Sequence, residues 1–126
     1  PVASQLLALQ ALQLGRDWVQ PKVQALAQVR AQVNQALQGL GDLVEFPHTQ
    51  GAFYVLMKLP GVSDPMAFNR AMTEKHRVAT LPGFAFGLSD TANANYQRLS
   101  YGALDAATVA EGVARYVAAV KDWYQT

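Results

Sequence analysis

The sequence contains no cysteine, and this absence excludes several kinds of chemistry at once. A chain without thiols forms no disulfide, no thiolate metal site and no cysteine nucleophile. Histidine is scarce as well: His48 and His76 stand alone, and neither has a second His, Asp or Glu at metal-ligand spacing. A glycine-rich phosphate loop and a G-x-S-x-G nucleophile elbow are also missing. We therefore expect no metal centre, no nucleotide-phosphate site and no serine-hydrolase site.

Clustered charge and long hydrophobic runs are missing too. Ten Lys and Arg residues against nine Asp and Glu residues give a net charge of +1, and the basic residues are scattered. Because phosphate backbones are bound by basic patches, we expect no nucleic-acid partner. No run approaches the roughly 20 apolar residues that span a bilayer. The apolar residues 1–14 lack a basic leader and contain three glutamines, so they do not resemble a signal peptide. We expect no membrane partner and a cytoplasmic location.

The chain has 126 residues, which suits a single domain with a core of its own. It begins at Pro1, without an initiator methionine, inside a stretch that is typical of a helix. We therefore expect a fragment of a longer polypeptide rather than a processed or trimmed independent domain. Within it, helices over residues 1–41 precede an α+β core over residues 42–126.

Two helices are predicted before residue 42. The first spans residues 3–14, with Gly15 as its stop. Asp17 is expected to cap the second, which places Pro21 in its first turn. Apolar positions along the second helix recur at alternating spacings of four and three and form one seam. The seam residues are Val19, Val23, Leu26, Arg30, Val33, Leu37 and Leu40.

The remaining elements alternate between strands and helices. Asp64 and Pro65 begin a predicted helix that ends near His76, and Asp105 caps a last helix. The inner face of that last helix is predicted to hold Val109, Val113, Tyr116, Val117, Val120 and either Trp123 or Tyr124. Strands are predicted over 43–46, 52–59, 78–80 and 97–101. This order predicts an α+β fold with a small, mostly antiparallel sheet and helices packed on one face.

One arginine stands out in the second half of the chain. Arg98 lies in a strand-like stretch with apolar or aromatic residues on either side. A planar guanidinium fixed in such a setting suits bidentate capture of a carboxylate. From the residues alone, a surface arginine that pairs with Asp90 or Asp105 is the alternative.

Four stretches resemble the C-terminal small domain of fold-type I, pyridoxal-phosphate-dependent aminotransferases of the aspartate aminotransferase class. They occur in the order and rough spacing of that family, and together they cover essentially the whole chain. They are the segment from Ala3 to Leu12, Gly-Ala-Phe-Tyr-Val (51–55), Pro-Gly-x-x-Phe-Gly (82–87) and Arg-Leu-Ser-Tyr (98–101). The loop over 89–95 lacks the glycine often found before the arginine strand, and Leu99 replaces the commoner isoleucine. These departures leave the subgroup open.

The resemblance implies an enzyme that moves an amino group between an amino acid and a 2-oxo acid, and that is a homodimer. In the family, the arginine that matches Arg98 binds the α-carboxylate of the substrate. The turn over 82–87 lies at the rim of the substrate pocket, so Phe84 is a candidate for substrate contact. We expect Phe86, Gly51 and Phe53 to belong to the core.

The lysines of the chain do not match the cofactor site of the family. Pyridoxal phosphate needs a lysine Schiff base and a phosphate cradle. None of the four lysines stands in the Ser-x-x-Lys-like context that carries the cofactor; they are Lys22, Lys58, Lys75 and Lys121. By resemblance, the cofactor-binding large domain is therefore absent from this chain. We expect the chain alone to contain no catalytic residue, to bind no pyridoxal phosphate and to be inactive.

A second hypothesis is a free-standing α+β module that binds a small carboxylate or a partner protein without catalysis. It would use the same pocket around Arg98. The two hypotheses differ in one structural expectation. A fragment should leave an apolar face on the helix over residues 17–40 without a partner in the chain, because monomeric proteins rarely keep such a face exposed.

Overall fold

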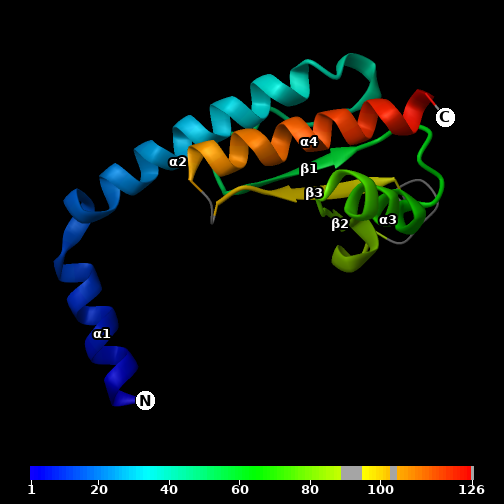
Figure 1. Cartoon of the computed structure of the whole chain (residues 1–126). Helices are drawn as coiled ribbons and strands as arrows, with labels where there is room; N and C mark the ends of the chain where they lie inside the picture. Colours follow the sequence, from blue (N-terminus) through cyan, green and yellow to red (C-terminus); the bar gives the residue numbers. More distant parts are fainter. Residues whose placement is uncertain (89–94, 103–104, 126) are drawn as a thin grey trace.

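The computed structural model describes residues 1–88, 95–102 and 105–125 (Figure 1). Its helices in these ranges are α1 (Val2–Gln13), α2 (Gly15–Gln38), α3 (Pro65–His76) and α4 (Ala106–Gln125). Its strands are β1 (Tyr54–Lys58), β2 (Leu81–Pro82) and β3 (Tyr96–Ser100), and two 3-10 helices are η1 (Gly41–Leu43) and η2 (Gly83–Phe86). The strands form an antiparallel sheet in the order β1-β3-β2. The predicted α+β class with a small antiparallel sheet is confirmed.

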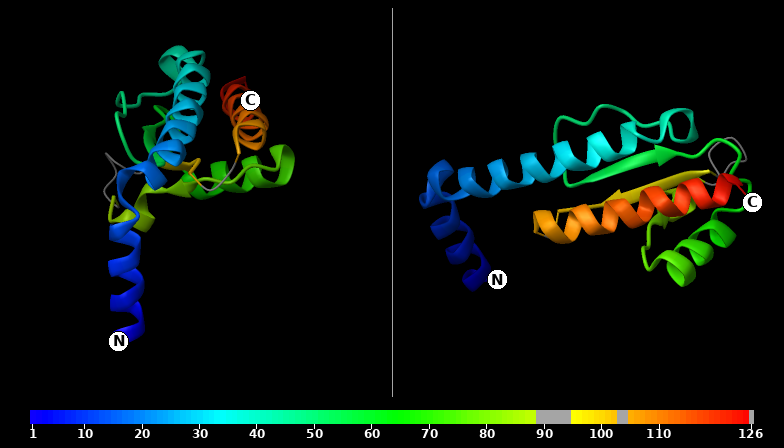
Figure 2. Two further views of the ribbon diagram at one scale, coloured as in Figure 1. Left: turned by 90° about the vertical axis from the view of Figure 1, so that its left-hand side faces the viewer. Right: turned by 45° about the horizontal axis from the view of Figure 1, so that its top comes forward.

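The core lies between one face of the sheet and the helices. Side chains alternate along β1 and β3, so that Val55, Met57, Gln97 and Leu99 are buried on the inner face. Helices α2 and α4 lie side by side over this face, and α3 packs against α4 (Figure 2). Of the predicted inner face of α4, Val109, Val113, Tyr116 and Val120 are buried, whereas Val117, Trp123 and Tyr124 are partly buried against the core. None of the described helices is both long and apolar enough to cross a bilayer.

The predicted caps of α3 and α4 are present. Asp64 Oδ1 accepts hydrogen bonds from the backbone N–H groups of Met66 at 3.0 Å and Ala67 at 2.9 Å. Asp105 Oδ1 accepts one from Thr108 at 2.9 Å. Such bonds satisfy backbone donors that have no partner inside the helix. The aspartates thus fix where both helices begin.

Two predicted strands are wrong. Leu43 is the last residue of η1, and of residues 43–46 only Glu45 pairs with the sheet, through a single bridge to Lys58. Residues 78–80 form no strand, and the backbone of Val78 bonds to the last turns of α3 instead. The Val78 N–H donates to the Met72 carbonyl at 3.4 Å, and the Val78 carbonyl accepts from the Thr73 hydroxyl. Pairing with β3 begins one residue later, at Leu81.

The start of α2 also differs from the prediction. The helix begins at Gly15, whose φ of +67° turns the chain after α1. Asp17 therefore lies in the first turn without a capping bond, and Pro21 lies inside the helix. The loop over 89–94, including Asp90, falls outside the described residues.

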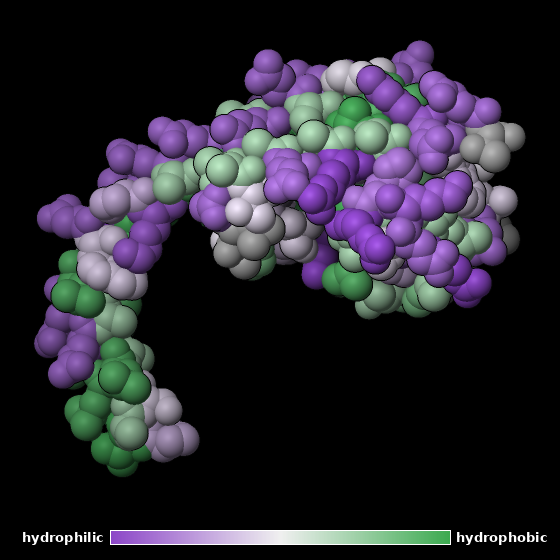
Figure 3. Space-filling view, viewed as in Figure 1, coloured by the Kyte–Doolittle hydropathy of each residue, from purple (hydrophilic) through white to green (hydrophobic). Residues whose placement is uncertain are grey.

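The first helix and the first half of α2 make no core contacts. Every residue of α1 is exposed, and α1 projects away from the rest of the chain (Figure 1). Val19 and Val23 of the predicted seam are 43% and 50% exposed, and burial begins only near Leu26 and Val29. Apolar side chains cover much of α1 (Figure 3). Among the described residues, this apolar surface has no partner, as a fragment is expected to leave it.

Candidate functional site

The candidate site lies on the face of the sheet that is turned away from α2, α3 and α4. In β3, Gln97 and Leu99 are buried toward the helices, so the alternation places Arg98 on the opposite face. The register sets Arg98 beside Leu56 of β1 and Leu81 of β2. An arginine therefore stands in the middle of a three-strand row whose other members are aliphatic.

Two aromatic rings hold the guanidinium of Arg98. Its Cζ atom lies 4.3 Å from the centre of the Phe86 ring and 5.2 Å from the centre of the Tyr54 ring. Both distances fall within the range of cation–π attraction. Tyr54 starts β1 and is a diagonal neighbour of Arg98 across the ladder, whereas Phe86 comes from η2. The guanidinium is thus fixed from two separate elements.

Arg98 has no carboxylate partner among the described residues. Its Nε atom is buried and makes no hydrogen bond there. The expected alternative partner Asp105 is engaged elsewhere, because its carboxylate accepts from both the N–H and the hydroxyl of Thr108 at 2.9 Å. These bonds, the backbone bond first, lower the pKa of Asp105 from its usual value. The other alternative, Asp90, lies outside the described residues. The positive charge of Arg98 is therefore not neutralised by a described side chain.

The turn that carries Phe86 packs closely on β3. A Cβ atom added at Gly83 would lie 2.8 Å from Cβ of Tyr96, so this position requires glycine. Gly87 closes the turn with a φ of +81°, which L side chains rarely adopt. Phe84 and Phe86 are 49% and 42% exposed, so the prediction that Phe86 belongs to the core is wrong. Phe84 makes no ring contact with Arg98.

Gly51 and Phe53, which precede β1, were also expected to belong to the core. Gly51 is exposed and Phe53 is 55% exposed, so that prediction is wrong for both residues. The Phe53 carbonyl accepts a hydrogen bond from the Tyr101 N–H at 2.9 Å, which extends the ladder by one bond beyond β1. Tyr101 itself is buried with the core residues. Of Tyr54 and Tyr101, only Tyr54 has a ring contact with Arg98.

The four lysines do not form a cofactor site within the described residues. The Lys22 ammonium lies 4.0 Å from the centre of the Trp18 ring, and Lys58 pairs with Glu45 at 3.2 Å. Lys75 and Lys121 belong to α3 and α4, on the helix side of the sheet. Pyridoxal phosphate needs a lysine amine for its aldehyde together with phosphate ligands. The described residues supply no such combination beside Arg98, and they contain no group of three metal-ligating side chains.

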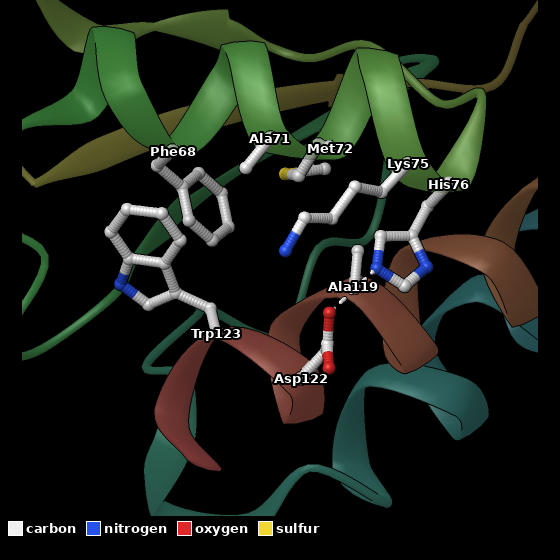
Figure 4. A pocket seen from close by; sticks show the side chains of 8 residues that line it. All are labelled: Phe68, Ala71, Met72, Lys75, His76, Ala119, Asp122 and Trp123. Atoms are coloured by element: carbon white, nitrogen blue, oxygen red, sulfur yellow. Dashed lines mark hydrogen bonds and ion pairs between the residues drawn. The ribbon is translucent and has the colours of Figure 1, made fainter. Parts of the chain in front are cut away.

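A separate cavity of about 370 Å³ lies between α3 and α4 (Figure 4). Phe68 and Trp123 form one wall, with ring centres 5.3 Å apart in an edge-to-face arrangement. His76 Nε2 lies 3.2 Å from Asp122 Oδ2 at the other end. His76, which stands alone in the sequence, thus has a carboxylate partner in the fold. The two residues are 46 positions apart, so sequence spacing gave no signal for this pair.

The contacts of Arg98 with the Tyr54 and Phe86 rings were also not predicted from the sequence. The register of β1 and β3 could have indicated Tyr54, because a diagonal neighbour on the same face follows from the strand period. No comparable signal existed for Phe86. Its place depends on how the 3-10 turn folds back over the sheet, which composition does not encode.

Comparison with known proteins identifies the family. The family model described as Aminotransferase class I and II matches residues 2–115. The aromatic aminotransferase ISS1 of Arabidopsis thaliana is 33% identical over 115 residues, which are 90% of this chain and 28% of that protein.

Solved structures share the fold. The α-aminoadipate aminotransferase LysN from Thermus thermophilus, complexed with N-(5'-phosphopyridoxyl)-L-leucine, superposes with a TM-score of 0.79 at 27% identity. The superposition covers 96% of this chain and 31% of LysN. An archaeal alanine:glyoxylate aminotransferase reaches a TM-score of 0.82 at 22% identity, over 97% of this chain and 31% of that one. The chain thus spans about a third of the length of these relatives, and it belongs to the class I and II aminotransferases.

Proposed function

We propose that this chain is the C-terminal small domain of a pyridoxal-phosphate-dependent aminotransferase, and that Arg98 binds the α-carboxylate of the amino-acid or 2-oxo-acid substrate. The observation that carries the proposal is the state of Arg98: its guanidinium is held by two rings on the open face of the sheet and meets no described carboxylate. A fixed cation without a protein counter-ion is prepared for an anionic ligand.

The chemical contribution of the chain is binding and orientation. Two parallel hydrogen bonds from the guanidinium to a carboxylate fix both the position and the plane of the substrate. Phe84, exposed in the same turn as Phe86, is the proposed apolar contact at the rim of the pocket. Closure of this domain over the substrate would exclude water from the reacting atoms.

The remaining parts of the enzyme lie outside this chain. We assign to them the Schiff-base lysine and the phosphate ligands, and we expect the isolated chain neither to bind pyridoxal phosphate nor to transaminate. The exposed apolar residues of α1, with Trp18, Val19 and Val23 of α2, are the proposed contact with the large domain. An exposed apolar surface of this kind argues against the second hypothesis, that the chain is a free-standing module, because monomeric proteins rarely keep one. The whole enzyme is proposed to be a homodimer, as the family resemblance implies, and to be cytoplasmic, which the absence of cysteine fits.

The test is an Arg98→Ala variant of the full-length enzyme. Charge-assisted hydrogen bonds contribute about 1.5–3 kcal/mol each, so losing two should lower kcat/KM roughly 100-fold or more. The Michaelis constants for both amino and 2-oxo acids should rise, while the cofactor absorbance stays unchanged. Aromatic amino acids are the first substrates to assay, given the name of the Arabidopsis relative.

The matched control is Arg115→Ala. This change removes the same charge from α4, where Arg115 is exposed and pairs with Glu111. Surface pairs of this kind contribute about 0–1 kcal/mol, so its kinetics should equal those of the wild type. If Arg98→Ala behaved like Arg115→Ala, Arg98 would have no role in carboxylate binding.

A further inference from the structure

Arg98 depends on two uncharged rings for its orientation. Phe86 lies against the guanidinium at 4.3 Å and Tyr54 at 5.2 Å, measured from Cζ to the ring centres. We propose that Phe86 and Tyr54 are positioning residues that hold this guanidinium ready for a carboxylate; this inference rests on the proposed function of Arg98. Neither residue is assigned a contact with substrate.

The type of group that fixes the guanidinium decides whether it can still bind a ligand, because an arginine can also be fixed by a carboxylate of the protein. Such a carboxylate would occupy the hydrogen-bonding edge of the guanidinium and neutralise its charge, so a substrate would have to displace it. An aromatic ring engages the flat face and leaves the N–H edge and the net charge in place. Orientation by rings therefore reduces the rotamer freedom lost on binding without competing with the ligand.

The buried Nε atom further limits how a ligand can bind. Nε of Arg98 is not accessible to solvent and has no described partner, so the side edge formed by Nε and one terminal nitrogen is closed. The two terminal nitrogens remain as the bidentate edge. A carboxylate would therefore bind end-on, to these two terminal nitrogens.

Phe86 is itself held in place by its turn. The Gly87 N–H donates to the Phe84 carbonyl at 3.1 Å, and the Leu88 N–H donates to the Gly83 carbonyl at 3.1 Å. Gly83 approaches β3 so closely that a methyl group would collide with Tyr96. The backbone of Phe86 therefore has a fixed place relative to the strand that carries Arg98, which a positioning role requires.

The test is a double-mutant cycle in the full-length enzyme between Phe86→Leu and Arg98→Ala. In the wild-type background, Phe86→Leu should raise the Michaelis constant of amino-acid and 2-oxo-acid substrates about tenfold. In the Arg98→Ala background the same change should have no further effect. A primary amine without a carboxylate serves as a second substrate, and its kinetics should not respond to Phe86→Leu. Tyr54→Leu should raise the same Michaelis constants as Phe86→Leu does. Tyr54→Phe keeps the ring and should retain the wild-type Michaelis constants.

Phe46→Leu is the matched control, because it removes the same ring from a half-buried site without an arginine contact. Its Michaelis constants should be those of the wild type. If Arg98→Ala itself left the constants unchanged, the proposed function would fail and this inference with it. If Arg98→Ala raised them but Phe86→Leu did not, or if the two effects were additive, only the positioning role would be overturned. An equal loss with the amine substrate would likewise overturn it, since that loss would indicate a structural effect.

Discussion

At the scale of single residues, two core tyrosines, Tyr101 and Tyr116, have hydroxyls that are buried without a described partner. Tyr116 of α4 is fully buried, and its hydroxyl makes no hydrogen bond to a described residue. Burial raises the pKa of Tyr116 well above its usual value, and the charge of Tyr124 would raise it further. Burial also raises the pKa of Tyr124, whose hydroxyl donates to the Pro60 carbonyl. Both phenols thus remain protonated in the folded chain at pH values where they ionise in the unfolded chain.

This pKa difference predicts a loss of stability at alkaline pH. Below pH 10, the ordinary pKa of tyrosine, both states keep the proton and pH has no effect through these groups. Above it the unfolded chain binds fewer protons than the folded one, so the free energy of unfolding falls by up to about 1.4 kcal/mol per pH unit and tyrosine. Tyr116→Phe should reduce that slope and, at pH 7, raise stability by about 1 kcal/mol because no unpaired hydroxyl is buried. Urea unfolding between pH 7 and 11.5 measures both effects, and an unchanged alkaline slope would contradict this account of Tyr116.

At the scale of elements, the structure separates glycines that the packing needs from glycines that it does not. A Cβ atom at Gly102 would lie 2.3 Å from Cβ of Phe53, whereas one at Gly112 in α4 would meet nothing within 4 Å. Gly102→Ala should therefore destabilise the chain by about 1–3 kcal/mol, because the end of the β1–β3 ladder must shift. Gly112→Ala should stabilise it by about 0.5–1 kcal/mol through helix propensity. Thermal unfolding of the two variants provides the comparison, and a change of the same sign in both would contradict it.

Element type was predictable wherever one local rule dominated. The caps at Asp64 and Asp105 and the apolar period of α4 fixed two helices, because capping and burial act over one or two turns. The strands predicted at 43–46 and 78–80 did not form. The N–H groups of Leu43 and Val44 donate to the carbonyls of Leu40 and Gly41, and both backbone groups of Val78 bond to α3. β propensity does not take account of backbone hydrogen bonds to groups outside the sheet.

In the candidate site, too, the features set by local sequence were predictable, and the contacts set by the tertiary fold were not. The sequence predicted that Arg98 lies in a strand, and the family resemblance singled this arginine out. Its ring contacts were not predicted, because Phe86 reaches it from a turn 12 residues away in the sequence. The His76–Asp122 pair was missed for the same reason, since it joins α3 to α4 across 46 positions. Long-range contacts of this kind depend on the folded arrangement and leave no periodic signal.

At the scale of the whole molecule, the chain divides into a packed part and an unpacked part. The sheet, α3, α4 and the second half of α2 share one core, whereas α1 contributes no buried residue. An isolated helix of fewer than about 12–15 residues is marginal in water, because most helical stability in proteins comes from packing. Nothing within the described residues supplies that packing to α1, which has 12 residues.

We therefore expect the amide hydrogen exchange of α1 to differ between the isolated chain and the full-length enzyme. In the isolated chain, amides of α1 should exchange with protection factors below about 10, while those of β1 and β3 exchange only through larger openings. In the full-length enzyme, α1 and the segment around Trp18 should become protected, because the large domain is proposed to cover their apolar side chains. The amides of exposed α4 residues such as Lys121 serve as the internal reference. Their exchange should be the same in both samples, because the proposed contact with the large domain does not reach α4. Strong protection of α1 in the isolated chain, at a concentration where it is monomeric, would show that α1 is stabilised without the large domain and would remove the argument for that contact.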